Sequence, residues 1–219
     1  MSAYQIGVDE AGKGPVLGPM VAAAVRADDS DLPDGIDDSK RLTAATRESI
    51  AAELQESSAV GVGLGVVTTD EIDDPETDMN SLTVAAQVRA LSEVAGEGDH
   101  ALVDAGDVSE SRFTRRVADG AADNSVAIDV TAEHGADEAS RLVGAASIIA
   151  KVERDSRIDA IGENYDRDIG SGYPSDPTTR EFLAKYVDRR GELPACARTS
   201  WATCEDVVTA AEQSNLAEF

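Results

Sequence analysis

The chain has 219 residues, of which 42% are hydrophobic and only 4% aromatic, so we expect a core built from Ala, Val, Leu and Ile. No apolar run reaches the roughly 18 residues of a membrane span, and the N-terminal residues lack the basic and apolar regions of a signal peptide. The two cysteines, Cys196 and Cys204, cannot form a disulfide framework. These features predict one large domain, with at most a small appendage, in the cytoplasm and without membrane association.

The formal charge of −24 comes from 19 Lys and Arg against 43 Asp and Glu. Taken alone, this balance argues against nucleic-acid binding, which usually requires a basic patch. The acidic residues are spread along the whole chain between apolar segments, which favours a folded protein with an acidic surface from a cell with molar internal salt. Because the Debye length falls to about 3 Å at 1 M salt, the net charge then says little about partners.

The apolar pattern predicts a series of strands and helices in chain order. The first half is expected to contain a strand over 4–8, a glycine turn over 12–15, a strand over 17–25, an acidic loop over 28–38, a helix over 43–56, a strand over 59–68 and a helix carrying Val84, Val88, Leu91 and Val94. The second half is expected to contain a strand over 101–103, a helix over 109–118, a strand over 125–130, a long helix carrying Leu142, Ala145, Ile149 and Val152, a loop over 170–177, a helix from Asp176 to Gly191 and a final amphipathic helix.

Early strands followed by alternating strands and helices indicate an α/β protein with a mixed sheet flanked by helices. The last helices have no strand left to cover. We therefore expect a catalytic domain over residues 1–161 and a small helical extension over residues 162–219.

The stretch around the glycine turn admits two interpretations. Gly7, Gly12 and Lys13 fit the spacing of a nucleotide-binding P-loop. That motif continues with Ser or Thr, whereas residue 14 is glycine, and the carboxylates of Asp9 and Glu10 would face the phosphates. The P-loop interpretation is therefore disfavoured.

The second interpretation treats the carboxylates as the functional groups. Asp9 ends the first predicted strand, Asp104 ends another, and Asp137 precedes the long helix. If the two strands are parallel neighbours, both aspartates lie at the carboxyl edge of the sheet. Crowded carboxylates raise one another's pKa unless a cation lies between them. Mg²⁺ and Mn²⁺ suit such oxygen ligands, and two ions can promote phosphodiester cleavage.

Six blocks in order along the chain carry a family resemblance. They are GVDEAGKGP at 7–15, DSKRLT at 38–43, VDA at 103–105, AASIIAKVERD at 145–155, GSGYPSDP at 170–177 and RTSWAT at 198–203. Together they resemble ribonuclease HII, the type 2 ribonuclease H, of the archaeal kind. The resemblance implies the ribonuclease H fold with a C-terminal helical extension. It also implies a metal-dependent endoribonuclease acting on RNA–DNA hybrids and on single ribonucleotides embedded in duplex DNA.

The resemblance assigns roles to individual residues. Catalysis and binding of Mg²⁺ or Mn²⁺ are expected from Asp9, Glu10, Asp104 and Asp137, and substrate binding from Gly12, Lys13, Gly14 and Tyr173. Two cations, Lys40 and Arg198, are further substrate-binding candidates, because each could contact a phosphate of the nucleic acid. Lys13 departs from the family, in which many relatives have Arg, while Tyr173 matches the tyrosine that stacks at the RNA-to-DNA junction. Attack of a metal-activated water on phosphorus implies 3′-hydroxyl and 5′-phosphate ends. A different carboxylate–metal nuclease, such as a junction resolvase, and a non-catalytic acidic binding protein are the alternatives.

Several further residues keep two interpretations each. Lys40 and Lys151 could bind phosphate or pair with the acidic site, and His134 could assist proton transfer or be solvated. Trp201 is expected to be a packing anchor of the extension.

The C-terminal tail has the spacing Q-x-x-L-x-x-F through Gln213, Leu216 and Phe219. This spacing resembles the short peptide by which replication and repair enzymes bind the sliding clamp, although an ordinary last helical turn has the same pattern. We otherwise expect a monomer.

Overall fold

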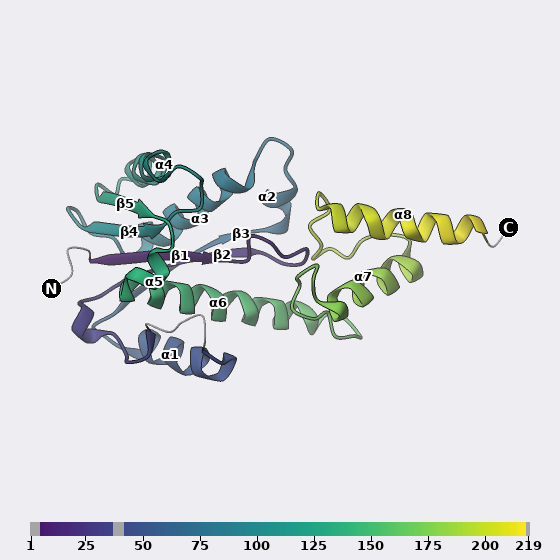
Figure 1. The fold of residues 1–219 in the computed structure, drawn as a ribbon, viewed down its shortest axis with the longest axis horizontal. Helices are drawn as coiled ribbons and strands as arrows, with labels where there is room; N and C mark the ends of the chain where they lie inside the picture. Colours follow the sequence, from purple (N-terminus) through teal and green to yellow (C-terminus); the bar gives the residue numbers. More distant parts are fainter. Residues whose placement is uncertain (1–4, 37–41, 218–219) are drawn as a thin grey trace. The chain divides into compact units, whose positions relative to one another are not determined.

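The computed structural model describes residues 5–36 and 42–217 of the chain (Figure 1). In chain order the elements are β1 (Ile6–Ala11), β2 (Met20–Arg26), the 3₁₀ turn η1 (Asp29–Asp31), α1 (Ala44–Glu56), β3 (Gly61–Val67), α2 (Thr69–Asp73), α3 (Met79–Val94), β4 (His100–Asp104), α4 (Glu110–Asp123), β5 (Asp129–Glu133), α5 (Ala136–Ala139), α6 (Arg141–Gly162), α7 (Pro177–Arg190) and α8 (Ala202–Ala217). Within these residues, no helix combines the length and the apolar character that crossing a bilayer requires.

Contacts between residues divide the chain into two compact units. The first comprises Met1–Ala11, Met20–Val67 and Met79–Arg154, and the second comprises Gly12–Pro19, Thr68–Asp78 and Asp155–Phe219. The second unit thus includes two N-terminal segments besides the helical C-terminal part.

The first unit contains a five-stranded mixed sheet in the order β3-β2-β1-β4-β5. β1 is antiparallel to β2 and parallel to β4, and β4 is parallel to β5. Helices α3 and α4 cover one face of this sheet, while α1 and α6 lie on the other (Figure 1). The expected α/β class is confirmed.

Small residues let the helices approach the sheet closely. A Cβ atom at Gly65 of β3 would overlap the carbonyl of Ala86 in α3, and one at Gly7 of β1 would overlap the backbone of Leu142 in α6. The side chains of β2 from Met20 to Val25 are fully buried, because both faces of this central strand are covered. The core is therefore closely packed although only 4% of the residues are aromatic.

The helix boundaries follow the predicted end signals. Thr43 caps α1 by accepting a hydrogen bond from the backbone N–H of Thr46. Asp176 caps α7, Pro177 occupies its first turn, and Gly191 ends it with a φ of 73°. These predictions are confirmed.

The structure corrects the position of the last strand. β5 runs over Asp129–Glu133, not over residues 125–130. Ser125 adopts a φ of 64°, and the N–H of Val126 bonds back to the carbonyl of Ala121. The chain therefore closes the end of α4 before the strand begins, and α4 is longer than predicted.

Two short helices were not predicted. α2 follows the predicted strand over 59–68, and Thr68 and Glu71 form a reciprocal capping box at its start. α5 precedes the long helix, and Ser140 separates the two.

The second unit has its own core. Val16, Leu17, Phe182 and Leu183 are buried in it, and the Trp201 ring packs against them. The indole N–H of Trp201 donates to the carbonyl of Pro15 at 2.6 Å. This confirms Trp201 as a packing anchor.

Candidate active site

Two carboxylates lie side by side at the carboxyl end of the parallel strands of the first unit. Val8 of β1 pairs with Val103 of β4, so the next residues, Asp9 and Asp104, occupy adjacent positions. The prediction that these two strands are parallel neighbours is confirmed. The glycine turn leads into strand β2 and not into a helix, which excludes the helix N-terminus that a P-loop requires.

Asp9 is the most buried of the predicted site carboxylates, with only 7% of its surface exposed. Burial, followed by the negative charges of Glu10 and Asp104, raises the pKa of the Asp9 carboxyl to about 8, although hydrogen bonds from Ser147 and the Glu10 N–H oppose the shift. A buried carboxylate with two carboxylate neighbours is a group whose ionised form needs a cation.

A polar chain on α6 reaches Asp9 from the interior. The ammonium of Lys151 donates to the Ser147 hydroxyl at 2.7 Å, and Ser147 hydrogen-bonds the Asp9 carboxylate. An ammonium group only donates, so the single Ser147 hydroxyl hydrogen points to Asp9. Lys151 therefore acts on the acidic site through Ser147, which is fully buried.

Gln87 of α3 connects Glu10 of β1 with the backbone of Asp104 in β4. Its amide nitrogen donates to the Glu10 carboxylate at 2.7 Å and to the Asp104 backbone carbonyl at 3.0 Å. The side chain is fully buried, and its Oε1 accepts no hydrogen bond within the described part of the chain. Gln87 is not among the site residues predicted from the sequence. The one indication in the sequence is that a polar residue lies between Val84 and Val88 on the apolar face of the predicted helix.

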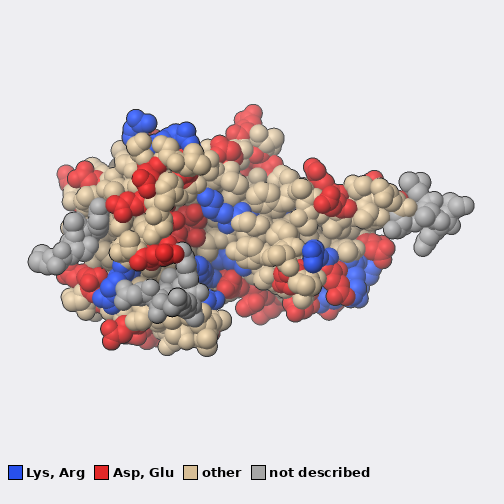
Figure 2. Space-filling view, viewed as in Figure 1, with Lys and Arg blue, Asp and Glu red and all other residues tan. Residues whose placement is uncertain are grey.

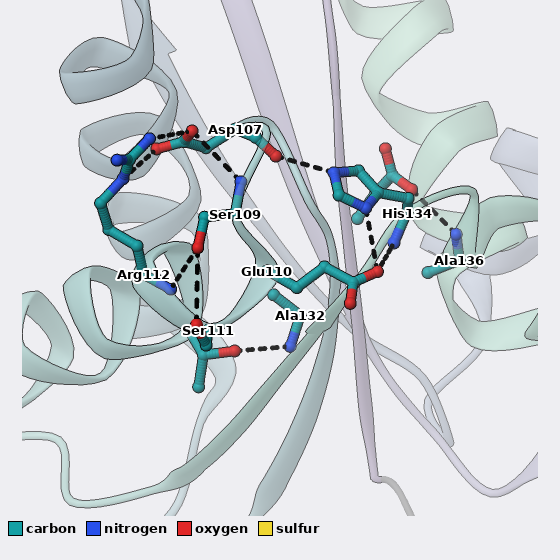
Figure 3. Close-up of polar contacts among 10 residues, drawn as sticks. Asp107, Ser109, Glu110, Ser111, Arg112, Ala132, His134 and Ala136 are labelled. Carbon is teal, nitrogen blue, oxygen red and sulfur yellow. Dashed lines mark hydrogen bonds and ion pairs between the residues drawn. The ribbon is translucent and has the colours of Figure 1, made fainter.

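Asp137 approaches the site from the segment after β5. It lies in α5 directly after Ala136, whose N–H donates to the Asp104 carboxylate at 2.9 Å (Figure 3). Asp137 is half-buried. The four predicted carboxylates therefore come from the ends of β1 and β4 and from α5.

Protein donors hold three of the four carboxylates, those of Asp9, Glu10 and Asp104. Within residues 5–36 and 42–217, no three acidic, His or Cys side chains are gathered in the arrangement of a metal site. The donor chemistry nevertheless fits a hard divalent cation, because all four groups offer carboxylate oxygens.

The second unit holds the predicted sugar-reading turn. Gly12 has a φ of 92°, a conformation that favours glycine. Arg198 donates from Nε to the carbonyl of Gly18 at 2.9 Å, and from its terminal nitrogens to those of Lys13 at 3.0 Å and Gly12 at 2.6 Å. Tyr173 is 37% exposed, and its ring edge lies 3.8 Å from where a Cβ at Gly14 would be.

The structure corrects the expectation that Arg198 touches nucleic acid. Its side chain is fully buried, and its guanidinium is committed to three backbone carbonyls. Arg198 therefore fixes the shape of the turn that contains Gly12 and Lys13 and does not itself present a charge to a ligand.

The structure gives less information on four other predicted site residues. Lys40 and Phe219 lie outside the described residues, while Gln213 is an exposed residue of α8 and Leu216 falls in the last turn of that helix.

The chain matches proteins of one family over nearly its whole length. The family model of ribonuclease HII matches residues 6–204. The ribonuclease HII of the haloarchaeon Haloarcula marismortui is 60% identical over 98% of this chain and 100% of its own, and its source agrees with the halophilic origin that the charge predicts.

Solved structures give the same match. The crystal structure of ribonuclease H2 from Pyrococcus horikoshii OT3 superposes with a TM-score of 0.84 at 36% identity, over 95% of this chain and 98% of that chain. The ribonuclease HII of Archaeoglobus fulgidus, solved in a complex with PCNA, superposes with a TM-score of 0.80 at 36% identity, over 92% and 95% of the two chains.

Proposed function

The chain belongs to the ribonuclease HII family and is an endoribonuclease, and we propose that it cleaves the RNA strand of RNA–DNA hybrids and single ribonucleotides embedded in duplex DNA. We assign the chemistry to the predicted catalytic domain, residues 1–161. The predicted extension, residues 162–219, contributes Tyr173 to substrate binding.

The observation that carries the proposal is the position of Asp9. Its buried carboxylate adjoins Glu10 in β1 and lies beside Asp104 at the end of the parallel strand β4. We assign binding of Mg²⁺ or Mn²⁺ to these three residues and Asp137. Two such ions, when bound, activate an attacking water and stabilise the leaving oxygen. The residues of the chain orient the carboxylates for this task, through Gln87 and the Ser147 hydroxyl.

We assign recognition of the ribonucleotide to the turn at residues 12–14. Backbone groups of Gly12 and Gly14 are suited to approach a 2′-hydroxyl closely, because glycine has no Cβ atom. Lys13 is half-buried and supplies a point charge for a phosphate oxygen. We assign stacking on a base or sugar to the partly exposed ring of Tyr173, which lies next to Gly14.

One assay tests the proposed function. A DNA duplex with a single ribonucleotide is incubated with the protein and Mg²⁺ or Mn²⁺ in molar salt, and an all-DNA duplex of the same sequence serves as the control. We expect cleavage on the 5′ side of the ribonucleotide, with 3′-hydroxyl and 5′-phosphate ends. Cleavage of both duplexes alike, or 2′,3′-cyclic phosphate ends, would contradict the proposal.

We further propose that the C-terminal tail binds the sliding clamp. Gln213, Leu216 and Phe219 have the spacing of a clamp-binding peptide. The relative from Archaeoglobus fulgidus, which is 36% identical, was solved in a complex with PCNA. Exposure of Gln213 at the end of α8 is compatible with such a contact.

A further inference from the structure

His134 lies in the turn between β5 and α5, three residues before Asp137. Figure 3 shows its ring directed at the segment that follows β4, with Glu110 on one side and the backbone of Asp107 on the other. The distances are 2.9 Å from Nδ1 to the Glu110 Oε1 atom and 2.8 Å from Nε2 to the Asp107 carbonyl oxygen. The backbone N–H of His134 donates to the same Glu110 oxygen at 2.9 Å.

The two ring contacts determine the charge of His134. A carboxylate oxygen and a backbone carbonyl oxygen are both acceptors, so each ring nitrogen must carry a hydrogen to bond its partner. Only the imidazolium form has hydrogens on both nitrogens. The pair of contacts therefore requires a positively charged His134, although about half of the side chain, 51%, is exposed.

The acceptors are themselves fixed to helix α4. Glu110 is the first residue of α4, and the Asp107 carboxylate is bonded by the Arg112 guanidinium and the Ser109 N–H. The imidazolium consequently joins the β5–α5 turn to a loop that Arg112 bonds to the first turn of α4.

These two joined segments carry two of the proposed metal ligands. Asp104 is the last residue of β4, directly before the loop that holds Asp107, and Asp137 follows the β5–α5 turn. The N–H of Ala136, in the second segment, holds the Asp104 carboxylate at 2.9 Å. A shift between the segments would lengthen this hydrogen bond and change the separation of the two carboxylates.

We propose that His134 is a positioning residue, whose imidazolium joins the segments after β4 and β5 and thereby sets the placement of Asp104 relative to Asp137. This inference rests on the proposed function for its effect on catalysis. Because both ring nitrogens are engaged by acceptors, His134 does not shuttle protons in this arrangement.

The surroundings of the ring favour the charged form. The Asp107 carbonyl, Glu110 and the charge of Asp104 all raise the pKa of His134, while desolvation opposes them and the Asp107 carboxylate is paired with Arg112. A raised pKa means that the link is complete at low pH and is lost as the pH rises through that pKa. Above it, the neutral ring can donate to only one of the two acceptors.

The ionisation is tested directly by NMR, because the chain has only two histidines, His100 and His134. Long-range ¹H–¹⁵N spectra of the metal-free protein report hydrogens on both ring nitrogens of an imidazolium. The His134 signals are identified by their absence in His134→Gln. We expect the imidazolium form at pH 7, and a neutral tautomer there would overturn the proposal.

The positioning role is tested with His134→Gln and Glu110→Ala, which break the link from opposite sides. Glu133→Gln, at the exposed neighbour of His134, is the matched control. In metal-free protein we expect faster hydrogen exchange at the Ala136 N–H in both test variants. We also expect Mn²⁺ binding, followed by electron paramagnetic resonance, to weaken by about 10-fold or more, as is typical for residues that orient metal ligands.

The double variant separates a shared role from independent effects. If His134 and Glu110 act as one link, His134→Gln/Glu110→Ala is no weaker in Mn²⁺ binding than either single variant. The proposal would be overturned if the losses of Mn²⁺ affinity in the two single variants added up in the double variant. It would also be overturned if the single variants matched Glu133→Gln in hydrogen exchange at Ala136 and in Mn²⁺ binding. A protein that binds Mn²⁺ normally but cleaves no ribonucleotide would refute the proposed function instead, since exchange and metal binding do not depend on cleavage.

Discussion

The side-chain nitrogen of Gln87 lies 2.7 Å from a carboxylate oxygen of Glu10. The same nitrogen lies 3.0 Å from the backbone carbonyl of Asp104, so one buried amide ties helix α3 to both parallel strands of the site. Its other polar atom, Oε1, is buried without a hydrogen bond from the described residues. Gln87 therefore orients the site at some expense to stability, because an unsatisfied buried acceptor costs about 1–3 kcal/mol.

Gln87→Met separates these two effects. Methionine has a similar volume, removes the donor to Glu10 and also removes the unsatisfied acceptor. We expect the melting temperature without metal to change little, while the Mn²⁺ concentration for half-maximal cleavage rises by about 10-fold or more. A parallel loss of thermal stability and activity would show that Gln87 is structural only.

Asp9→Asn should abolish activity but stabilise the metal-free fold. The carboxyl has a pKa of about 8 in the folded protein and about 3.9 when unfolded. The folded state therefore binds the proton more tightly, and ionisation of Asp9 lowers stability as the pH rises from about 4 to 8. Asparagine carries no charge, so the variant lacks this loss.

The measurement is a series of thermal melts in EDTA across that pH range, with the exposed Asp34→Asn as the control. We expect Asp9→Asn to melt above the wild type at pH 7 and the difference to shrink towards pH 4. Mg²⁺ should raise the melting temperature of the wild type more than that of the variant. Cleavage should fall by orders of magnitude, and near-normal activity would remove Asp9 from the mechanism.

Arg198→Lys tests whether the turn at residues 12–14 depends on the buried guanidinium. A lysine ammonium cannot reproduce the planar arrangement that reaches the carbonyls of Gly12, Lys13 and Gly18. We expect the melting temperature to fall by several degrees and KM for a ribonucleotide-containing duplex to rise more than kcat falls. The exposed Arg115→Lys is the control, and an unchanged KM would leave Arg198 with a purely structural role.

Salt should stabilise the protein. Figure 2 shows acidic side chains spread over the face drawn, in keeping with the formal charge of −24. Raising the salt from about 0.1 M to 1 M shortens the Debye length from about 10 to 3 Å and screens their repulsion. We expect the melting temperature to rise over this range, and a flat or falling curve would contradict the halophilic interpretation of the surface.

The sequence predicts the parts of the site that depend on strand order. Asp9 and Asp104 each end an apolar segment, and parallel pairing of β1 with β4 brings them together as expected. Helix ends at Thr43 and Gly191 follow from local capping chemistry, which needs no information from distant residues.

The remaining features depend on contacts between distant parts of the chain. Arg198 and Gly12 are 186 residues apart, and no local pattern distinguishes a buried arginine from one that faces nucleic acid. His134 finds its partners 24 and 27 residues upstream, so an isolated loop histidine is all that the sequence shows. Gln87 lies within the predicted apolar face of a helix, and its polarity is the one feature of the sequence that indicates a role in the site.

The clamp-binding tail gives the last prediction. α8 continues to Ala217, so the helix includes Gln213 and Leu216, and Phe219 follows two residues after its end. Residues three apart lie on the same side of a helix, so one further turn would place Leu216 and Phe219 together for an apolar pocket. We expect the double variant Leu216→Ala/Phe219→Ala to lose at least 10-fold in affinity for the sliding clamp of the same cell, measured in high salt.

Asn215→Ala, between the motif positions, is the matched control, and cleavage of a short duplex without the clamp should be unchanged. Equal binding by the double variant and the control, or binding by neither these nor the wild type, would reduce the tail to an ordinary final helical turn.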